Sequence, residues 1–174
     1  MKLKRTRGKT IKRRRIENKT NYDKRLNMLK SGSLRIVFRK SNRYIQAQLV
    51  ESIESQDKIL INLKSSELMK YGWPEEARNS LKSLPASYLI GYLIGNKIDD
   101  KSKKKGLIVD LGMYRTVHKS KIYAFIKGLV DAGVEVTSKE DIFPEEDRIK
   151  GNHLKNKIVM KKFDEVKKKI GGKK

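Results

Sequence analysis

Residues 34–50 constrain the fold of this chain more than any other stretch. In both halves of LRIVFRKSNRYIQAQLV, apolar residues occupy alternate positions. A period of two predicts two β-strands, each with one buried face and one face toward solvent or a partner. Between them, Ser41 and Asn42 suit a tight turn. We therefore predict a β-hairpin with a two-residue polar turn and three cations (Arg39, Lys40 and Arg43) crowded at its tip.

The cations at this tip fit an anionic partner, and the alternative is a merely solvated charged turn. The whole chain favours the partner, because 43 Lys and Arg against 20 Asp and Glu give a net charge of +23. Such an excess indicates a polyanion. Residues 1–30 hold 13 Lys/Arg and 2 Asp/Glu, residues 155–174 hold 9 and 2, and residues 31–154 hold 21 and 16. We expect two basic arms, ordered by a phosphate backbone, around an ordinary folded domain.

The domain organisation follows from these shifts in composition. Residues 1–30 are predicted to be a basic arm that binds the polyanion, extended over 1–20 and with a short amphipathic helix over 22–30. Residues 31–136 form an α/β domain, residues 137–154 an acidic, irregular segment, and residues 155–174 a basic tail with a weakly amphipathic helix.

Within the domain, alternation over residues 58–63 predicts a third strand, antiparallel to the second. A largely buried helix begins at Pro85, and we expect its Gly91 and Gly95 to pack closely against the sheet. The apolar run 107–111 is typical of an interior strand, and a helix over 120–132 follows it. The fold class is therefore α/β: a mixed, largely antiparallel sheet with helices mainly on one face, plus basic terminal extensions.

An enzyme has little support. The chain lacks cysteine and holds two histidines, His118 and His153. Asp110 is the one carboxylate in a plausible catalytic position, and a lone strand-end Asp is more often a turn or helix cap. We expect no catalysis, no cofactor, no metal and no small-molecule substrate. No apolar run approaches the roughly 20 residues that span a bilayer, and no signal peptide is visible, so a cytoplasmic protein without a membrane partner is expected.

The remaining question is which polyanion binds. The hairpin mixes arginines with the amides of Gln46 and Gln48, which can reach base edges or 2′-hydroxyls. This mixture fits folded RNA better than DNA packaging, which needs no amide-rich strand face. The alternative is a general nucleic-acid-binding or chaperone-like protein without a fixed RNA partner.

Five blocks of the sequence resemble the archaeal and eukaryotic branch of the large-subunit ribosomal protein eighteen family. They are RKSNRYIQAQLVES (39–52), KYGW (70–73), LPASYLIGYLIG (84–95), VDLGMYRTVHKSKIYAFIKGLVDAG (109–133) and DIFPEEDRIKGNHL (141–154). The resemblance implies a structural protein that binds 5S rRNA, joins it to 23S rRNA in the central protuberance, and contacts neighbouring proteins including the ribosomal protein five family. The chain departs from related sequences at residues 17–19, ENK, where a glycine is frequent, and the tail after residue 154 is poorly matched.

By position, the residues expected to bind RNA fall in three basic segments. In the arm they are Arg13, Arg14, Arg15, Lys19 and Tyr22. On the hairpin they are Arg35, Arg39, Lys40, Ser41, Asn42, Arg43 and Gln48. After the fourth strand they are Arg115, His118 and Lys119, and His118 could equally pack on protein.

Overall fold

A computed structural model of the chain describes residues 11–54, 56–104, 106–136, 140–154 and 157–172. Its elements, in chain order, are α1 (Arg13–Ile16), α2 (Tyr22–Lys30), β1 (Arg35–Lys40), β2 (Ile45–Ile53), β3 (Gln56–Lys64), η1 (Ser65–Tyr71), η2 (Glu75–Ser80), α3 (Leu84–Lys97), α4 (Asp100–Lys104), β4 (Ile108–Asp110), α5 (Lys121–Asp131), η3 (Glu140–Ile142), α6 (Glu146–Lys150) and α7 (Ile158–Gly171). The predicted fold class is confirmed: the chain is α/β, with a four-stranded mixed sheet.

The predicted hairpin is confirmed, and its turn is shifted by one residue. Strands β1 and β2 pair antiparallel from Arg35 opposite Val50 to Lys40 opposite Ile45. Residues 41–44 connect the two strands. The Ser41 backbone N–H donates to the Tyr44 carbonyl at 2.8 Å, and the Ser41 hydroxyl accepts from the Tyr44 N–H at 2.9 Å. These bonds pair Ser41 with Tyr44, so the two residues at the turn are Asn42 and Arg43 instead of the expected Ser41 and Asn42.

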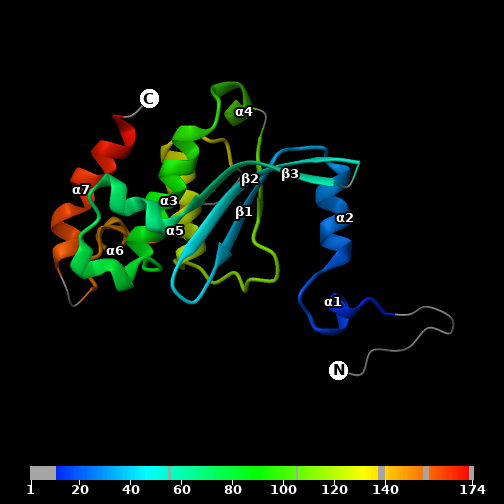
Figure 1. Cartoon of the computed structure of the whole chain (residues 1–174), viewed down its shortest axis with the longest axis horizontal. Coiled ribbons are helices and arrows are strands. Elements are labelled where there is room, and N and C mark those ends of the chain that lie inside the picture. Colours follow the sequence, from blue (N-terminus) through cyan, green and yellow to red (C-terminus); the bar gives the residue numbers. More distant parts are fainter. Residues whose placement is uncertain (1–10, 55, 105, 137–139, 155–156, 173–174) are drawn as a thin grey trace.

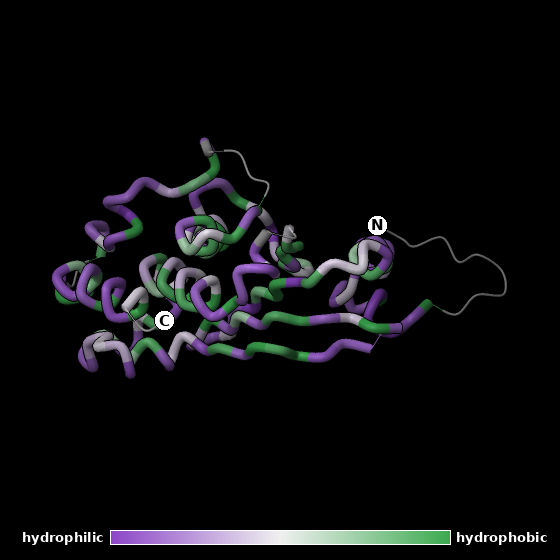
Figure 2. The backbone as a smooth tube through the Cα atoms, turned by 90° about the horizontal axis from the view of Figure 1, so that it is seen from above, coloured by the Kyte–Doolittle hydropathy of each residue, from purple (hydrophilic) through white to green (hydrophobic). Residues whose placement is uncertain are grey.

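The sheet order is β3-β2-β1-β4, with β3 antiparallel to β2 as predicted. Strand β4 pairs parallel with β1 and lies at an edge of the described sheet, so the prediction of an interior strand over 107–111 is wrong. Its apolar character has another cause, because Leu107 is buried in the core and Val109 and Leu111 pack against that core. Coloured by hydropathy, the strands show green stretches interrupted by purple ones (Figure 2).

Helices α3, α5, α6 and α7 gather to one side of the sheet, and α1 and α2 lie at the other side (Figure 1). Helix α3 is the centre of the core, and 11 of its 14 residues are buried. Gly91 and Gly95 do permit a close approach, but the partner is α5 and not the sheet. A Cβ at Gly91 would collide with the Phe125 carbonyl oxygen, and one at Gly128 would collide with the Tyr88 carbonyl oxygen. Each helix thus presents a glycine to the backbone of the other, which brings the two axes close together.

The basic tail joins the core, which corrects the prediction of a C-terminal arm ordered by phosphate. Helix α7 buries Val159, Phe163, Val166 and Ile170. The Phe163 ring lies 5.6 Å from the Tyr88 ring of α3. The amphipathic helix was predicted, but its apolar stripe is sufficient to dock it on α3 without RNA.

The N-terminal segment differs, because neither α1 nor α2 buries any residue. The prediction of a helix over 22–30 is confirmed, and the Asn21 side chain caps it by accepting from the Lys24 N–H at 3.1 Å. The extended conformation expected for residues 1–20 is wrong at 13–16, which form α1, while residues 1–10 lie outside the described part of the chain.

Candidate nucleic-acid interface

The sheet has one apolar face and one polar face. Side chains that point away from α3 and α5 alternate along each strand, so the register places Arg39 beside Gln46 and Val37 beside Gln48. Asp57 and Asp110 belong to the same face, opposite Ser52 on β2 and Val37 on β1 respectively. We call this surface the polar face. It carries two carboxylates and several arginines, and ion pairs between them decide which cations remain available to a ligand.

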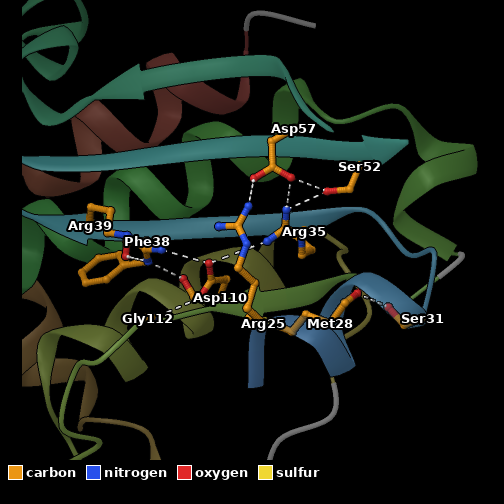
Figure 3. A network of polar contacts seen from close by, with 10 residues as sticks. All are labelled: Arg25, Met28, Ser31, Arg35, Phe38, Arg39, Ser52, Asp57, Asp110 and Gly112. Carbon is orange, nitrogen blue, oxygen red and sulfur yellow. Dashed lines mark hydrogen bonds and ion pairs between the residues drawn. The ribbon is translucent and has the colours of Figure 1, made fainter. Parts of the chain in front are cut away.

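Arg35 is the buried centre of the polar face, so the expectation that it points to solvent or a partner is wrong. Its side chain is only 2% exposed. The guanidinium donates from Nη2 to Asp57 Oδ1 at 2.6 Å and to Ser52 Oγ at 2.7 Å, and its Nη1 lies 4.0 Å from Asp110 Oδ2 (Figure 3). A buried guanidinium needs such partners, since an unpaired charge in the interior is costly. Arg35 therefore holds Asp57 and Ser52 in place and is almost closed to solvent.

Arg39 is held by the end of β4 and yet stays accessible. Its Nη2 donates to Asp110 Oδ2 at 2.9 Å, and its Nη1 donates to the carbonyls of Phe38 and Asp110 at 2.8 and 3.0 Å (Figure 3). The other carboxylate oxygen of Asp110 accepts from the Gly112 N–H at 2.7 Å. Asp110 thus shapes the turn after β4, as its sequence position suggested, and fixes Arg39. The Arg39 side chain is 44% exposed, so part of the guanidinium can still meet a phosphate.

Asp57 ties the N-terminal segment to the sheet. Arg25 of α2 reaches across β1 and donates to Asp57 Oδ2 at 3.1 Å (Figure 3). Partial burial raises the pKa of Asp57, but the Ser52 hydrogen bond and the charges of Arg35 and Arg25 outweigh it and hold the pKa below its ordinary value. Asp57 therefore stays ionised and joins two arginines from different elements.

A groove of about 690 Å³ opens between the N-terminal segment, the polar face and the chain after β4. We call it the N-terminal groove. The part of its lining that the structure describes includes one carboxylate, Asp110, and seven Lys or Arg residues: Arg14, Lys19, Lys24, Arg25, Arg35, Arg39 and Arg115. Five of these cations were predicted from three separate basic segments, namely Arg14, Lys19, Arg35, Arg39 and Arg115. The structure brings those segments to one place.

Short-range contacts shape the rim of the groove. Asn18 adopts a left-handed backbone conformation with φ of 52°, which glycine favours and asparagine tolerates. This explains why glycine suits the position at which the chain departs from its relatives. Arg14 Nε donates to Thr20 Oγ1 at 2.9 Å, and Lys19 pairs with Glu17 at 2.7 Å. The Lys12 ammonium lies 4.4 Å from the centre of the Tyr22 ring.

An amide cluster lies further along the polar face. The amide nitrogens of Gln46 and Gln48 both donate to Asn62 Oδ1, at 2.9 and 3.2 Å. Asn62 was not predicted, although its position between Ile61 and Leu63 in an alternating strand placed it on the same face as Gln48. Three amides held in this way keep acceptors and donors for base edges or 2′-hydroxyls.

The other predicted residues lie on the N-terminal segment, along the hairpin and around a second cavity. Lys40, Arg115 and Lys119 line a pocket of about 470 Å³, which we call the basic pocket. Tyr114 and Arg115 line both the N-terminal groove and the basic pocket. His118 packs on protein, with its ring 6.1 Å from the Tyr123 ring in an edge-on arrangement. Neither cavity is lined by the remaining predicted residues, which are Arg13, Arg15, Tyr22, Ser41, Asn42, Arg43, Gln48 and His118.

Sequence reasoning missed Lys24 and Arg25 in the N-terminal groove. Both lie on α2, where helical spacing drew attention to the apolar residues and away from the polar side. No residue of α2 is fully buried, so its charged residues were candidates for binding, and the composition of α2 was the available signal. Across the described residues, no helix combines the length and the apolar content that a membrane crossing needs.

Comparison with known proteins identifies the family of this chain. Residues 4–107 match the family described as ribosomal large subunit proteins 60S L5, and 50S L18. The chain is 43% identical over 145 residues to large ribosomal subunit protein uL18 of Korarchaeum cryptofilum, covering 82% of this chain and 70% of the relative. It is 38% identical over 155 residues to the protein of that name from Thermofilum pendens, covering 87% and 74%. For the Caldivirga maquilingensis protein the identity is 41% over 143 residues, covering 82% and 67%. The chain therefore belongs to the uL18 family of large-subunit ribosomal proteins.

Proposed function

We propose that this structural protein of the large ribosomal subunit binds 5S rRNA through the N-terminal groove and helps attach it to 23S rRNA in the central protuberance. It works in the cytoplasm and contacts neighbouring large-subunit proteins, including the ribosomal protein five family. No bond is made or broken. Its physical task is to neutralise phosphates that would otherwise repel when two RNAs approach.

The observation that supports this proposal is the convergence of cations in the N-terminal groove. The described lining residues include one carboxylate and seven Lys or Arg residues from the N-terminal segment, β1 and the chain after β4, and six of these seven reach the surface, Arg35 being the exception. Lys24 and Arg115 are exposed and make no ion pair with any described carboxylate, so their charge is free for a ligand. Phosphates position a nucleic acid on such a surface, and the amide cluster of Gln46, Gln48 and Asn62 adds groups that can read bases or riboses.

The test is the double variant Arg14→Gln with Lys24→Gln. Both side chains are exposed on the N-terminal segment, which buries nothing, so the fold should be unaffected. We expect binding of 5S rRNA to weaken about tenfold at fixed salt, because the variant removes two charge-assisted interactions with phosphate. The matched control is Lys97→Gln with Lys101→Gln, which removes the same charge from exposed sites outside both cavities.

Equal losses in the two double variants would show that only net charge matters, and the groove would not be the RNA site. Duplex DNA of similar length provides the second comparison. Binding of RNA and DNA with the same affinity at matched salt would favour a general nucleic-acid-binding or chaperone-like protein without a fixed RNA partner.

A further inference from the structure

The basic pocket is a concentration of positive charge on the far side of the Tyr114 and Arg115 pair. It is lined at the hairpin end by Phe38 and Lys40, and elsewhere by residues from the starts of α3 and α5 and from the segment 148–154. Among its described lining residues are five Lys or Arg side chains, one histidine and no carboxylate: the basic side chains are Lys40, Arg115, Lys119, Lys121, Arg148 and His153. Of these side chains, only Lys119 makes an ion pair with a described carboxylate, Glu145 at 2.9 Å, while the Lys40 ammonium lies 5.5 Å from the centre of the Tyr114 ring.

The cations in the basic pocket are close enough to disfavour one another. Partial burial lowers the pKa of Lys121, and the neighbouring charges of Lys40 and Lys82 lower it further. Partial burial also lowers the pKa of His153, and Arg148 and Lys121 add to the effect. A folded chain tolerates such mutual repulsion only at some cost in stability, and an anion in the pocket would remove that cost.

The starts of two helices add donors and partial positive charge. Ser83 and Ser120 are the N-cap residues of α3 and α5, and both line the basic pocket. Ser83 caps α3 by accepting from the Ala86 N–H at 3.4 Å. Ser120 makes no capping bond, and its buried Oγ has no hydrogen-bond partner among the described residues. A buried hydroxyl normally has a partner, so this one indicates a missing acceptor beside the start of α5.

We propose that the basic pocket binds a phosphate of the RNA backbone, as a second RNA-binding site next to the N-terminal groove. This inference rests on the proposed function for the source of the phosphate. Arg115 lines both cavities, so an RNA that lies in the groove can continue over Tyr114 and Arg115 into the pocket. Phosphate fits the pocket because it is compact, anionic and a strong acceptor for Lys, Arg and a helix start.

His153 supplies a direct reporter in the unmodified chain. The sequence holds two histidines, so the imidazole signal of His153 is readily told from that of His118, which the described pocket lining does not include. NMR titration should show that 5S rRNA raises the pKa of His153 by about half a unit or more. Inorganic phosphate should raise the pKa of His153 in the same direction when compared with chloride at equal ionic strength.

The variant for this test is Lys121→Gln with Arg148→Gln, and Lys97→Gln with Lys101→Gln is again the charge-matched control. In the pocket variant, neither RNA nor phosphate should raise the pKa of His153, and 5S rRNA should bind about five- to tenfold more weakly than to the control variant at the same salt.

Three outcomes would overturn the proposal. If 5S rRNA binds through the groove and leaves the pKa of His153 unchanged, the pocket is empty in the complex, while the proposed function stands. If phosphate alone raises the pKa and the full chain does not bind RNA, the pocket is an anion site for a free phosphate and the proposed function fails with it. If polyglutamate raises the pKa and RNA does not, the pocket takes an acidic protein segment instead.

Discussion

The two basic ends of the chain have similar composition and different structures. Helices α1 and α2 of the N-terminal segment bury no residue, and Ile16 and Leu26 are 56% and 51% exposed. Helix α7 carries as dense a run of lysines and yet buries four apolar side chains against the core. The density of positive charge therefore does not tell whether a segment folds onto the protein.

The spacing of apolar residues separates these two cases. In α7 the residues 159, 163, 166 and 170 recur every three or four positions and form one stripe, which α3 can cover. In the N-terminal segment polar contacts replace that stripe. The Arg25–Asp57 pair and the Asn21 cap hold α2, and the cations around it remain at the surface of the N-terminal groove. Helix α7 thus stabilises the fold, while the N-terminal segment leaves its cations exposed for the binding role proposed above.

Shortening a buried side chain of α7 should have the largest effect on stability. Phe163→Ala removes a ring that is 3% exposed and lies against Tyr88, so we expect the free energy of unfolding in urea to fall by about 3–5 kcal/mol. The matched change in the N-terminal segment, Leu26→Ala, should stay within about 0.5 kcal/mol. Similar losses for both variants would show that the two ends are packed alike.

Loss of the ion pairs that hold the N-terminal segment should have the next largest effect on stability. Asp57→Asn leaves buried Arg35 without its closest carboxylate, and we expect a loss of about 1–3 kcal/mol in the free energy of unfolding. Because the pKa of Asp57 is lower in the folded protein than its ordinary value of 3.8, its stabilisation is present above about pH 4 and is lost as the pH falls through the folded pKa. The free energies of unfolding of the unmodified protein and of Asp57→Asn, measured in urea at a series of pH values, should therefore converge in acid. A gap of constant size from pH 7 to pH 2 would contradict this assignment.

Removal of residues 1–20 should affect RNA binding and leave the fold nearly intact. We expect the thermal midpoint to stay within about 3 °C, which corresponds to less than about 1 kcal/mol. The slope of log affinity for 5S rRNA against log salt should become shallower by about 0.9 for each phosphate that the shortened chain no longer neutralises. A large drop in the midpoint would mean that this end, like α7, contributes to the core.

The smallest effect on stability is expected at the hairpin tip. Arg43 is exposed in the 41–44 connection and makes no ion pair with a described residue, so Arg43→Ala should change stability by less than about 0.5 kcal/mol. Strands hold the tip in place, so a contact there costs less ordering than on a loose segment. We predict that in Arg43→Ala, filter binding at fixed salt will show a larger loss of affinity for 5S rRNA than for unrelated duplex RNA. Equal losses would assign the tip to general charge neutralisation.

The hairpin, the third strand and the helix from Pro85 could all be predicted from the sequence. The spacing of apolar residues and the density of charge are local properties, because they depend only on residues that are close in the sequence. The sequence therefore predicts which residues of one strand or helix share a face. The predictions also included five of the cations that line the N-terminal groove, although as members of three unrelated segments.

Tertiary structure alone decided which of those cations are available. Arg35 and Arg39 look equivalent in an alternating strand, but Arg35 is buried against Asp57 and Arg39 is half exposed beside Asp110, 71 residues away. In the same way, Gly91 packs on α5 and not on the sheet, and the lysine-rich tail docks on α3. Each outcome depends on a partner that is distant in the chain. Because burial and ion pairing are set by such distant contacts, no local pattern of residues contains them.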